Sequence, residues 1–321
     1  MTTNENPQLH VVLGGTGGIG GAIVNELVAR GMPARSVSRS GRHAAEGAEV
    51  VSADISDPEQ TRRAVEGAAV VYHATMPAYH RWVQEFPAMN RNVIEAIGAV
   101  GARLVYVDNL YMYGPTDEPR TEDSPQRATD KKGVVRRELA AELLEAHAEG
   151  SLQVAIGRLP DYFGPGATNS ATGARFFEPA LEGKTVRWLG DLDMPHALAY
   201  LPDVGRAFVT LGTDDVALGR AWHLPVAGSP SGREFTAAVS EITGQPIKVS
   251  ATGRNVLRLV GLFDPTVREA AEMLYQWQRP FLVSDEAFQR ELGPQPPTPL
   301  DDALATTVKW FEARRRSGAA A

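Results

Sequence analysis

A cluster of glycines between residues 10 and 21 is the part of the sequence best suited to hold a ligand. The apolar run 11–13 predicts a buried strand and residues 22–29 predict an amphipathic helix, so the glycines form the turn between them. Such a turn lets the backbone approach a pyrophosphate, and free N–H groups at the helix start attract the anion. The order of strand, turn and helix favours dinucleotide binding over an ordinary glycine-rich turn. The residues predicted to form this phosphate site are Gly14, Thr16, Gly17, Gly18, Ile19 and Gly20.

The end of the next predicted strand, within residues 34–40, indicates which dinucleotide is bound. An NAD site places a carboxylate here to accept hydrogen bonds from the ribose 2′-hydroxyl, but this sequence has Ser38, Arg39 and Ser40. A guanidinium beside small hydroxyls suits a 2′-phosphate, which a carboxylate would repel. We therefore expect NADP(H) in preference to NAD(H), with Arg42 near enough to share the role. The alternative is that Arg39 is a solvated arginine in a loop.

Strand and helix patterns alternate along the chain and must position these groups. Short apolar runs that begin at residues 48, 69, 103 and 154 predict further buried strands, with helical segments between them. This alternation predicts an α/β fold, a Rossmann-type doubly wound parallel sheet with a smaller C-terminal substrate lobe. We expect an NADP-binding domain over residues 1–165, with later returns near 197–225, and a substrate-binding lobe formed mainly by residues 166–321.

The composition limits what the chain can be. With 321 residues, 43% of them apolar, it can bury a substantial core. The net charge of −7 gives no basic field for nucleic acid, and the absence of cysteine excludes disulfides and thiolate metal sites. Residues 1–9 carry no secretion pattern, and no apolar stretch approaches the ~20 residues that cross a membrane. We expect a cytoplasmic protein with a small-molecule substrate, no metal site, and neither nucleic acid nor membrane as partner.

Several motifs resemble those of the extended or atypical short-chain dehydrogenase/reductase superfamily, which includes NAD(P)-dependent epimerases and dehydratases. They are the turn Gly14-x-x-Gly17-x-x-Gly20, the pair Asp54-Ile55, the segment 109–114 and the segment 158–166. The resemblance implies further cofactor contacts, which are Asp54 and Ile55 at the adenine ring, Ala74 and Thr75 at the ribose, and Leu159, Pro160 and Tyr162 at the nicotinamide. His73 precedes the ribose contacts, and a histidine at a strand end is more often structural than catalytic.

The chain departs from that superfamily where the catalytic pair should be. Members carry a tyrosine and, four residues later, a lysine that holds the nicotinamide ribose and lowers the tyrosine pKa. No register of this sequence gives the pair. The matching positions hold Asp130 and Val134 or, shifted by one residue, Thr129 and Gly133.

Three residues remain as candidates for catalysis. Asn109 occupies the position of the active-site serine or threonine; its amide can donate a hydrogen bond to a carbonyl but cannot relay a proton. Tyr111 or Tyr113 could supply a phenol, although Tyr111 fits equally well as an aromatic in the pocket wall. Lys132 could reach the ribose from the preceding turn. The candidates are thus Asn109, Tyr111 and Lys132.

Three classes of function fit these observations. The first is an NADP(H)-dependent oxidoreductase, and bulky residues between 252 and 281 favour a largely apolar carbonyl or enone substrate over a sugar nucleotide. The second is an epimerase, dehydratase or isomerase that keeps its NAD(P) bound. The third is a regulatory NADP-binding protein without catalysis, which the missing tyrosine and lysine favour. Relatives often pair through two helices, here 89–100 and 134–148, so a homodimer is a further expectation.

Overall fold

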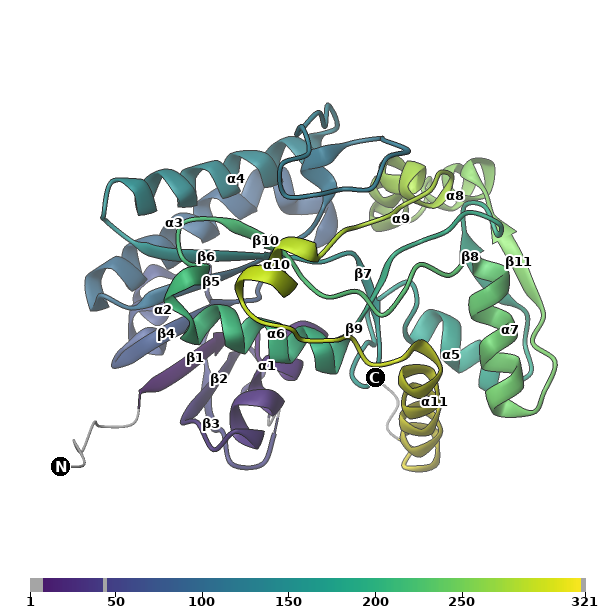
Figure 1. Cartoon of the computed structure of the whole chain (residues 1–321), viewed down its shortest axis with the longest axis horizontal. Coiled ribbons are helices and arrows are strands. Elements are labelled where there is room, and N and C mark those ends of the chain that lie inside the picture. Colours follow the sequence, from purple (N-terminus) through teal and green to yellow (C-terminus); the bar gives the residue numbers. More distant parts are fainter. Residues whose placement is uncertain (1–7, 43–44, 319–321) are drawn as a thin grey trace.

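Seven strands of the described chain, residues 8–42 and 45–318, form one parallel sheet in the computed structural model (Figure 1). The strand order β10-β6-β5-β4-β1-β2-β3 reverses direction between β1 and β4, where α/β sheets bind ligands. The predicted Rossmann-type doubly wound sheet is therefore confirmed. The strands are β1 (Leu9–Leu13), β2 (Ala34–Ser38), β3 (Glu49–Ser52), β4 (Ala68–His73), β5 (Arg103–Asp108), β6 (Gln153–Arg158) and β10 (Ala221–His223).

Helices cover both faces of this sheet (Figure 1). One layer consists of α2 (Pro58–Val65), α3 (Trp82–Val100) and α4 (Lys131–Ala148). The other contains α1 (Gly18–Ala29) and α6 (Leu201–Thr213), which pack against each other. Three short 3₁₀ helices lie in connections, namely Tyr79–Arg81, Tyr111–Tyr113 and Asp215–Ala217.

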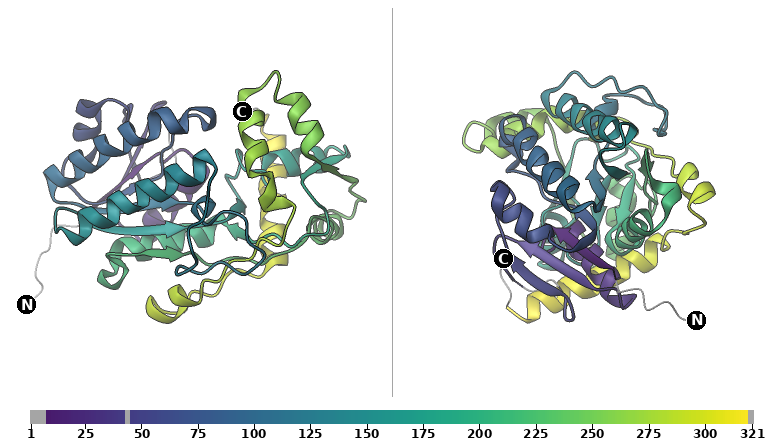
Figure 2. Two further views of the ribbon diagram at one scale, coloured as in Figure 1. Left: turned by 90° about the horizontal axis from the view of Figure 1, so that it is seen from above. Right: turned by 90° about the vertical axis from the view of Figure 1, so that its left-hand side faces the viewer.

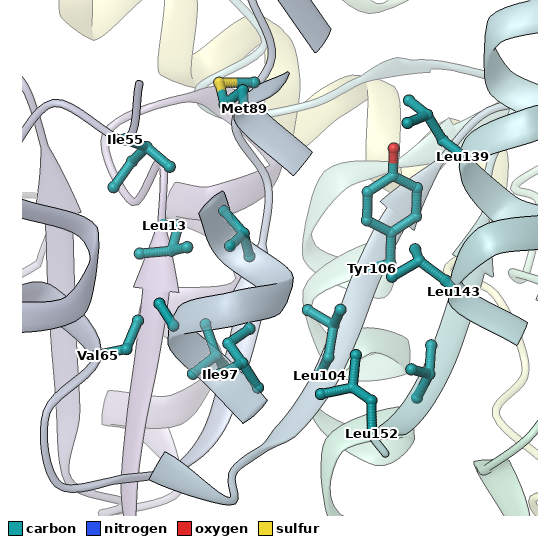
Figure 3. Close-up of a cluster of buried hydrophobic side chains, with 14 of the residues drawn as sticks. Leu13, Ile55, Val65, Met89, Ile97, Leu104, Tyr106, Leu139, Leu143 and Leu152 are labelled. Atoms are coloured by element: carbon teal, nitrogen blue, oxygen red, sulfur yellow. The ribbon is translucent and has the colours of Figure 1, made fainter. Parts of the chain in front are cut away.

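Alternate residues of the strands face the two helix layers, as the period of a β-strand requires. Leu13 and Leu104 pack in the core beneath α2, α3 and α4, whereas Val12 and Val105 pack in the core on the side of α1 and α6. Figure 3 shows the first of these cores, in which Leu13 and Leu104 lie among side chains from the helices. Burial on both sides explains why these strands are continuous apolar runs.

A second part of the molecule lies beside the carboxyl ends of the strands and has its own aromatic core (Figures 1 and 2). Phe176, Phe177, Phe235 and Phe311 pack together there with Trp188. Its elements are α5 (Ala174–Leu181), β8 (Val186–Leu189), α7 (Gly232–Thr243), β11 (Val249–Thr252), α8 (Arg254–Val260), α9 (Pro265–Ala270) and α11 (Leu300–Arg316). We call this part the C-terminal lobe. Its predicted substrate binding stays a prediction.

The remaining elements connect the lobe to the sheet. They are β7 (Asp161–Phe163), β9 (Leu198–Tyr200), the 3₁₀ helix Ala271–Trp277 and α10 (Glu286–Glu291). Strands β7 and β9 pair in parallel directly beyond the end of β6. No helix within residues 8–42 and 45–318 combines the length and apolar character that crossing a membrane requires.

The bulky side chains between 252 and 281 divide between the lobe core and the surface. Leu257 and Trp277 are buried in the lobe core, while Leu259 and Phe263 are exposed, Phe263 to 87%. The segment is not one helix, because α8 and α9 are separated by a turn and followed by the 3₁₀ helix.

Candidate active site and cofactor cradle

The glycine turn joins β1 to α1 as the sequence predicts, and packing requires glycine at two of its positions. Gly14 has φ +88°, and a Cβ there would lie 2.8 Å from the carbonyl oxygen of Ala74. A Cβ at Gly20 would lie 2.1 Å from the carbonyl oxygen of Gly14. Gly17 caps α1 without a side-chain hydrogen bond, so N–H groups of the first turn remain for an anion. A dinucleotide pyrophosphate fits this cradle, beside the exposed Thr16.

The end of β2 places small hydroxyls and a guanidinium at the far side of the cradle. Ser38 ends the strand with its Oγ 3.4 Å from that of Ser40, and Arg39 between them is exposed, as is Arg42. The described residues Ser38–Ser40 offer no carboxylate for a ribose 2′-hydroxyl. This arrangement is compatible with a 2′-phosphate.

Asp54 and Ile55 follow β3 and have different environments. The Asp54 carboxylate accepts hydrogen bonds from Ser56, which lower its pKa, and the nearby charge of Arg39 lowers it further. Ile55 is 5% exposed and packs in the core beneath α2 and α3. The next residue but one, Asp57, caps α2. The expected adenine contact of the Asp54-Ile55 pair stays a prediction.

A cavity of about 110 Å³ lies at the carboxyl ends of β5 and β6, next to the cradle. Ile19, in the first turn of α1, lines it, so a ligand on the glycine turn would reach this cavity. Of the residues predicted from sequence, Asn109, Tyr111, Leu159, Pro160 and Tyr162 also line it. The other lining residues are Val107, Asp108, Arg136, Asp161, Gln276 and Phe281. The last two come from the segment that follows α9.

Asn109 lines this cavity, and the oxygen of its side-chain amide is engaged by the backbone. Its Oδ1 accepts a hydrogen bond from the backbone N–H of Tyr111 at 3.0 Å, and only the oxygen of the amide can do so. The Nδ2 group is therefore the atom of Asn109 left to donate a hydrogen bond to a ligand. This geometry agrees with the carbonyl-polarising role expected for Asn109, which itself stays a prediction.

The two tyrosines of the 111–113 turn have different environments. Tyr111 lines the cavity, stacks on Trp82, and has its pKa raised by burial and by the nearby carboxylate of Asp161. Tyr113 is buried, and its hydroxyl lies 2.9 Å from Nη1 of Arg158 and 2.7 Å from Nε2 of His223. Tyr113 therefore has no hydroxyl free for a substrate.

Lys132 is the predicted catalytic residue that the structure places outside the cavity lining. Its side chain is 1% exposed, and its ammonium forms an ion pair with Glu269 of α9 and lies 4.6 Å from the centre of the Tyr79 ring. To reach a nicotinamide ribose, Lys132 would have to leave Glu269. Its predicted contact with the ribose stays a prediction. At the position of the superfamily's tyrosine, Asp130 caps α4 by accepting from the N–H of Gly133 at 2.8 Å.

A buried charge cluster lies beside the cavity, and two of its members, Asp108 and Arg136, line it. Asp108 lies 3.2 Å from Arg158 and 3.4 Å from Arg136, and all three side chains are at most 2% exposed. Burial and the charge of Arg158 lower the pKa of His223 to about 3, which leaves that imidazole neutral. Its Nδ1 faces the carbonyl oxygen of Ser284 at 3.1 Å and therefore carries the proton, so Tyr113 donates to Nε2. This cluster holds β5 and β6 together.

The segment after β4 lies against the glycine turn. The backbone N–H of Ala74 donates to the carbonyl oxygen of Leu13, and the hydroxyl of Thr75 lies 3.0 Å from Nδ1 of His73. Burial lowers the pKa of His73 to about 3, and its ring packs edge-on against Tyr106. These contacts agree with a structural rather than a catalytic His73.

Sequence reasoning missed the pair of Asp161 and His196. Asp161 Oδ2 lies 2.9 Å from Nε2 of His196, and Nδ1 of the same ring lies 3.1 Å from the carbonyl oxygen of Gln276. Asp161 directly follows the predicted contact Pro160, so its place in the motif was a signal for the site. Nothing in the sequence around His196 indicates this partner, which lies 35 residues away.

Among the described residues, no group of three histidine, aspartate or glutamate side chains could hold a metal ion.

Residues 10–223 match the model of a known protein family, the NAD-dependent epimerase/dehydratase family. No curated protein sequence matches the chain.

Solved structures of similar fold cover nearly the whole chain. An epimerase from Methanothermobacter thermautotrophicus is 19% identical with a TM-score of 0.81, over 97% of this chain and 94% of that one. A dTDP-glucose 4,6-dehydratase from Streptomyces venezuelae, solved with NAD bound, is 18% identical with a TM-score of 0.79, over 97% and 98%. A UDP-glucuronic acid 4-epimerase from Bacillus cereus, in complex with NAD, is 14% identical with a TM-score of 0.76, over 95% and 99%. At these identities the likeness is one of fold.

Proposed function

The chain belongs to the NAD-dependent epimerase/dehydratase family, and from this premise we propose that it is an NADP(H)-dependent oxidoreductase acting on a small carbonyl or enone compound. One observation carries the proposal. Ile19 of the glycine turn lines the same cavity as Asn109, so a dinucleotide with its pyrophosphate on the turn would bring its nicotinamide to a carbonyl held by Asn109. The nicotinamide would supply or accept the hydride there.

The choice of NADP(H) rests on the end of β2. Ser38, Arg39 and Ser40 offer hydroxyls and one guanidinium, which suit a 2′-phosphate through charge-assisted hydrogen bonds. NAD-bound relatives of similar fold make NAD the alternative. The nearby Asp54 carboxylate already accepts two hydrogen bonds from Ser56, so it does not depend on Arg39 for partners.

The choice of a small carbonyl compound rests on the walls of the cavity. Most of its lining is apolar or aromatic, and Asp161 contributes a carboxyl group. A solved UDP-glucose 4-epimerase from Thermotoga maritima, similar in fold at 19% identity, carries UDP-glucose. We rank a sugar nucleotide below a carbonyl or enone for this chain, with epimerisation or dehydration as the alternative reaction.

A regulatory NADP-binding protein is the second candidate function. It is favoured by the residues at the two positions that match the superfamily's tyrosine and lysine. The Asp130 side chain caps the N-terminus of α4, and Val134 has no polar side-chain group. A protein with this site could bind the cofactor and pass its presence to a partner without turnover.

A paired experiment tests the proposal. NADPH and NADH are titrated against the purified protein by fluorescence, and NADPH consumption is then followed with a panel of aldehydes, ketones and enones. UDP-glucose and dTDP-glucose are incubated with the protein and NAD and analysed for isomerised or dehydrated products. Turnover of a carbonyl or enone supports the oxidoreductase. Turnover of a sugar nucleotide alone would replace it by the epimerase or dehydratase, and NADPH binding without any turnover would favour the regulator.

A further inference from the structure

The hydrogen bonds around His196 require more protons than a neutral imidazole has. Its Nδ1 lies 3.1 Å from the carbonyl oxygen of Gln276, and a carbonyl oxygen can only accept, so Nδ1 carries a proton. A neutral ring then has a bare Nε2. Yet Nε2 lies 2.9 Å from Oδ2 of Asp161, which as a carboxylate also only accepts. One additional proton must therefore lie between Nε2 and Oδ2.

This shared proton lies at the boundary between the protein interior and the cavity. The His196 side chain is 1% exposed, whereas the Asp161 side chain is 30% exposed and lines the cavity together with Asn109 and Tyr111. Asp161 is close enough to Tyr111 for its charge to raise the pKa of that phenol. The carboxyl group of Asp161 is thus the part of the pair that a ligand can touch.

The imidazole is fixed in orientation by an aromatic stack. The Trp277 ring stacks on it with ring centroids 3.7 Å apart, and the Phe281 ring stacks on it at 4.9 Å. The guanidinium of Arg120 lies 4.1 Å from the centre of the Phe281 ring. These stacks restrict rotation of the His196 ring, and stacking on Trp277 tolerates a protonated ring. Phe281 also lines the cavity, as does Gln276, the neighbour of Trp277 in the chain.

Other titratable groups of the cavity are worse proton donors. Burial raises the pKa of Tyr111 and raises that of Tyr162 to about 12, and Tyr113, outside the lining, already donates to His223. The carboxylate of Asp108 is held by two arginines. Arg136, the remaining charged residue of the lining, is itself one of those two arginines.

We propose that Asp161 and His196 act together as the general acid and base of the site, with Asp161 as the catalytic residue that touches the substrate and His196 as the positioning residue that shares its proton. The proposal rests on the proposed function, because it assigns the proton that carbonyl reduction consumes. The proton donor of the site then comes from Asp161 on β7 and His196 in the loop before β9, and not from α4, where the superfamily has its tyrosine and lysine.

The proposed step balances in atoms and electrons. The substrate carbonyl carbon receives a hydride, with its two electrons, from reduced NADP(H), and the π pair of the C=O bond moves to oxygen. That oxygen takes the proton shared by Asp161 and His196. The pair is left as a carboxylate hydrogen-bonded to water and a neutral imidazole, and it regains a proton from solvent. In the oxidative direction the same pair accepts the hydroxyl proton.

The first arm of the test needs neither cofactor nor substrate. In the isotope-labelled full-length protein, ¹⁵N shifts of the His196 ring and the ¹³C shift of the Asp161 carboxyl locate the proton at about pH 6 to 7. H196Q identifies the resonances of His196 among those of the seven histidines. We expect a proton on Nδ1 and another shared with Asp161, and in D161N the shared proton should be absent, because an asparagine amide can itself donate to Nε2 of a neutral ring. An ionised Asp161 beside a neutral imidazole would overturn the proposal.

The second arm measures turnover of a carbonyl that the wild type reduces. D161N should lower kcat by roughly 10²- to 10⁴-fold, with the Kd of NADPH within about threefold of the wild type. H196Q should lower kcat less than D161N does. It should also abolish the part of the pH dependence of kcat that arises from the Asp161–His196 pair. The matched control D193N makes the same change at an exposed carboxylate paired with Arg233 and should be silent.

The possible failures are distinguishable. If the wild type reduces carbonyls and D161N retains its kcat, Asp161 is not the acid, while the proposed function stands. If the first arm finds the shared proton but no carbonyl is reduced, the proposed function fails and the catalytic role of the pair fails with it. Loss of kcat in D161N together with weakened NADPH binding or a lower melting temperature would identify a structural role and would also overturn the assignment.

Discussion

Lys132 of α4 and Glu269 of α9 form an ion pair that joins the helix layer of the sheet to the C-terminal lobe. The lysine is 1% exposed and the glutamate 24%, so the pair is partly shielded from solvent. The first prediction follows from this contact. K132M should increase hydrogen exchange over residues 254–277 and lower the free energy of unfolding by about 1–3 kcal/mol, because Glu269 loses its partner.

Exchange measured by mass spectrometry and urea unfolding check this prediction. Arg62→Met is the control, because Arg62 and its partner Glu59 are both more than half exposed, and it should change stability by less than about 1 kcal/mol. The opposite result would be informative: weaker NADPH binding by K132M without faster exchange in α9 would support a direct contact of Lys132 with the ribose.

Arg39 should determine the preference between the two dinucleotides. R39A removes the exposed guanidinium after β2 and should weaken NADPH binding about 10- to 100-fold while leaving NADH within about threefold, as expected for loss of a charge-assisted hydrogen bond to a phosphate. Fluorescence titration with both dinucleotides is the measurement, with Arg62→Ala at an exposed arginine of α2 as the control. Equal losses for both ligands would mean that no 2′-phosphate contacts Arg39.

Gly20 should tolerate no side chain. In G20A the new Cβ would lie 2.1 Å from the carbonyl oxygen of Gly14, so α1 and the turn must move apart. We expect loss of dinucleotide binding and a destabilisation of about 1–3 kcal/mol, measured by titration and thermal unfolding. G98A is a matched control in α3, where a Cβ would meet no atom within 4 Å and alanine favours the helix. An unchanged Kd in G20A would contradict the proposed cradle.

Asn109 should act through its amide nitrogen. N109D keeps the Oδ1 that accepts from Tyr111 and replaces the donor Nδ2 by a carboxylate oxygen, so the turn stays intact while the contact to a substrate carbonyl is lost. kcat/KM for carbonyl reduction should fall at least about 100-fold, with NADPH binding retained. Asn25→Asp at an exposed position of α1 should leave kcat/KM unchanged. Full activity of N109D would remove Asn109 from the site.

Acid should destabilise the fold partly through His223. Its pKa is lowered to about 3 in the folded protein, against 6.5 for an ordinary histidine, so the unfolded chain binds the proton more tightly. Stability is therefore fully present above pH 6.5 and is lost as the pH falls from 6.5 toward 3. H223Q should reduce the slope of the free energy of unfolding against pH by up to about 1.4 kcal/mol per pH unit.

Urea unfolding between about pH 5 and 7.5 measures the slope for the wild type, H223Q and the control H80Q, whose histidine is exposed. H223Q will also lower stability at every pH, because Tyr113 loses its acceptor. The slope and not the absolute value is therefore the test. Identical slopes for the wild type and H223Q would show that His223 is protonated in the folded state.

Local sequence patterns were sufficient to predict the sheet and the glycine cradle. Apolar runs such as 11–13 and 104–107 are buried on both sides, and the turn between β1 and α1 depends on residues that are close in sequence. The cavity position of Asn109 could also be predicted, because it follows β5 directly. The binding roles expected at the cradle and the cavity are still predictions.

Contacts between distant segments were the part that the sequence did not reveal. Lys132 contacts Glu269, which is 137 residues away in the sequence, and Asp161 contacts His196, which is 35 residues away. No local spacing therefore indicates either pair. Asp108 shows the same limit: its carboxylate neutralises two buried arginines, although a polar residue at a strand end looks equally suited to catalysis. Partner choice depends on the tertiary fold.

Strand β10 has a consequence for biosynthesis. It completes the edge of the sheet by pairing with β6, yet residues 221–223 follow α5, β8 and α6 in the chain. A nascent chain must therefore expose the hydrogen-bonding edge of β6 until these residues leave the ribosome, and an unpaired strand edge recruits other chains. A protein cut after residue 165 would carry that open edge permanently and should aggregate.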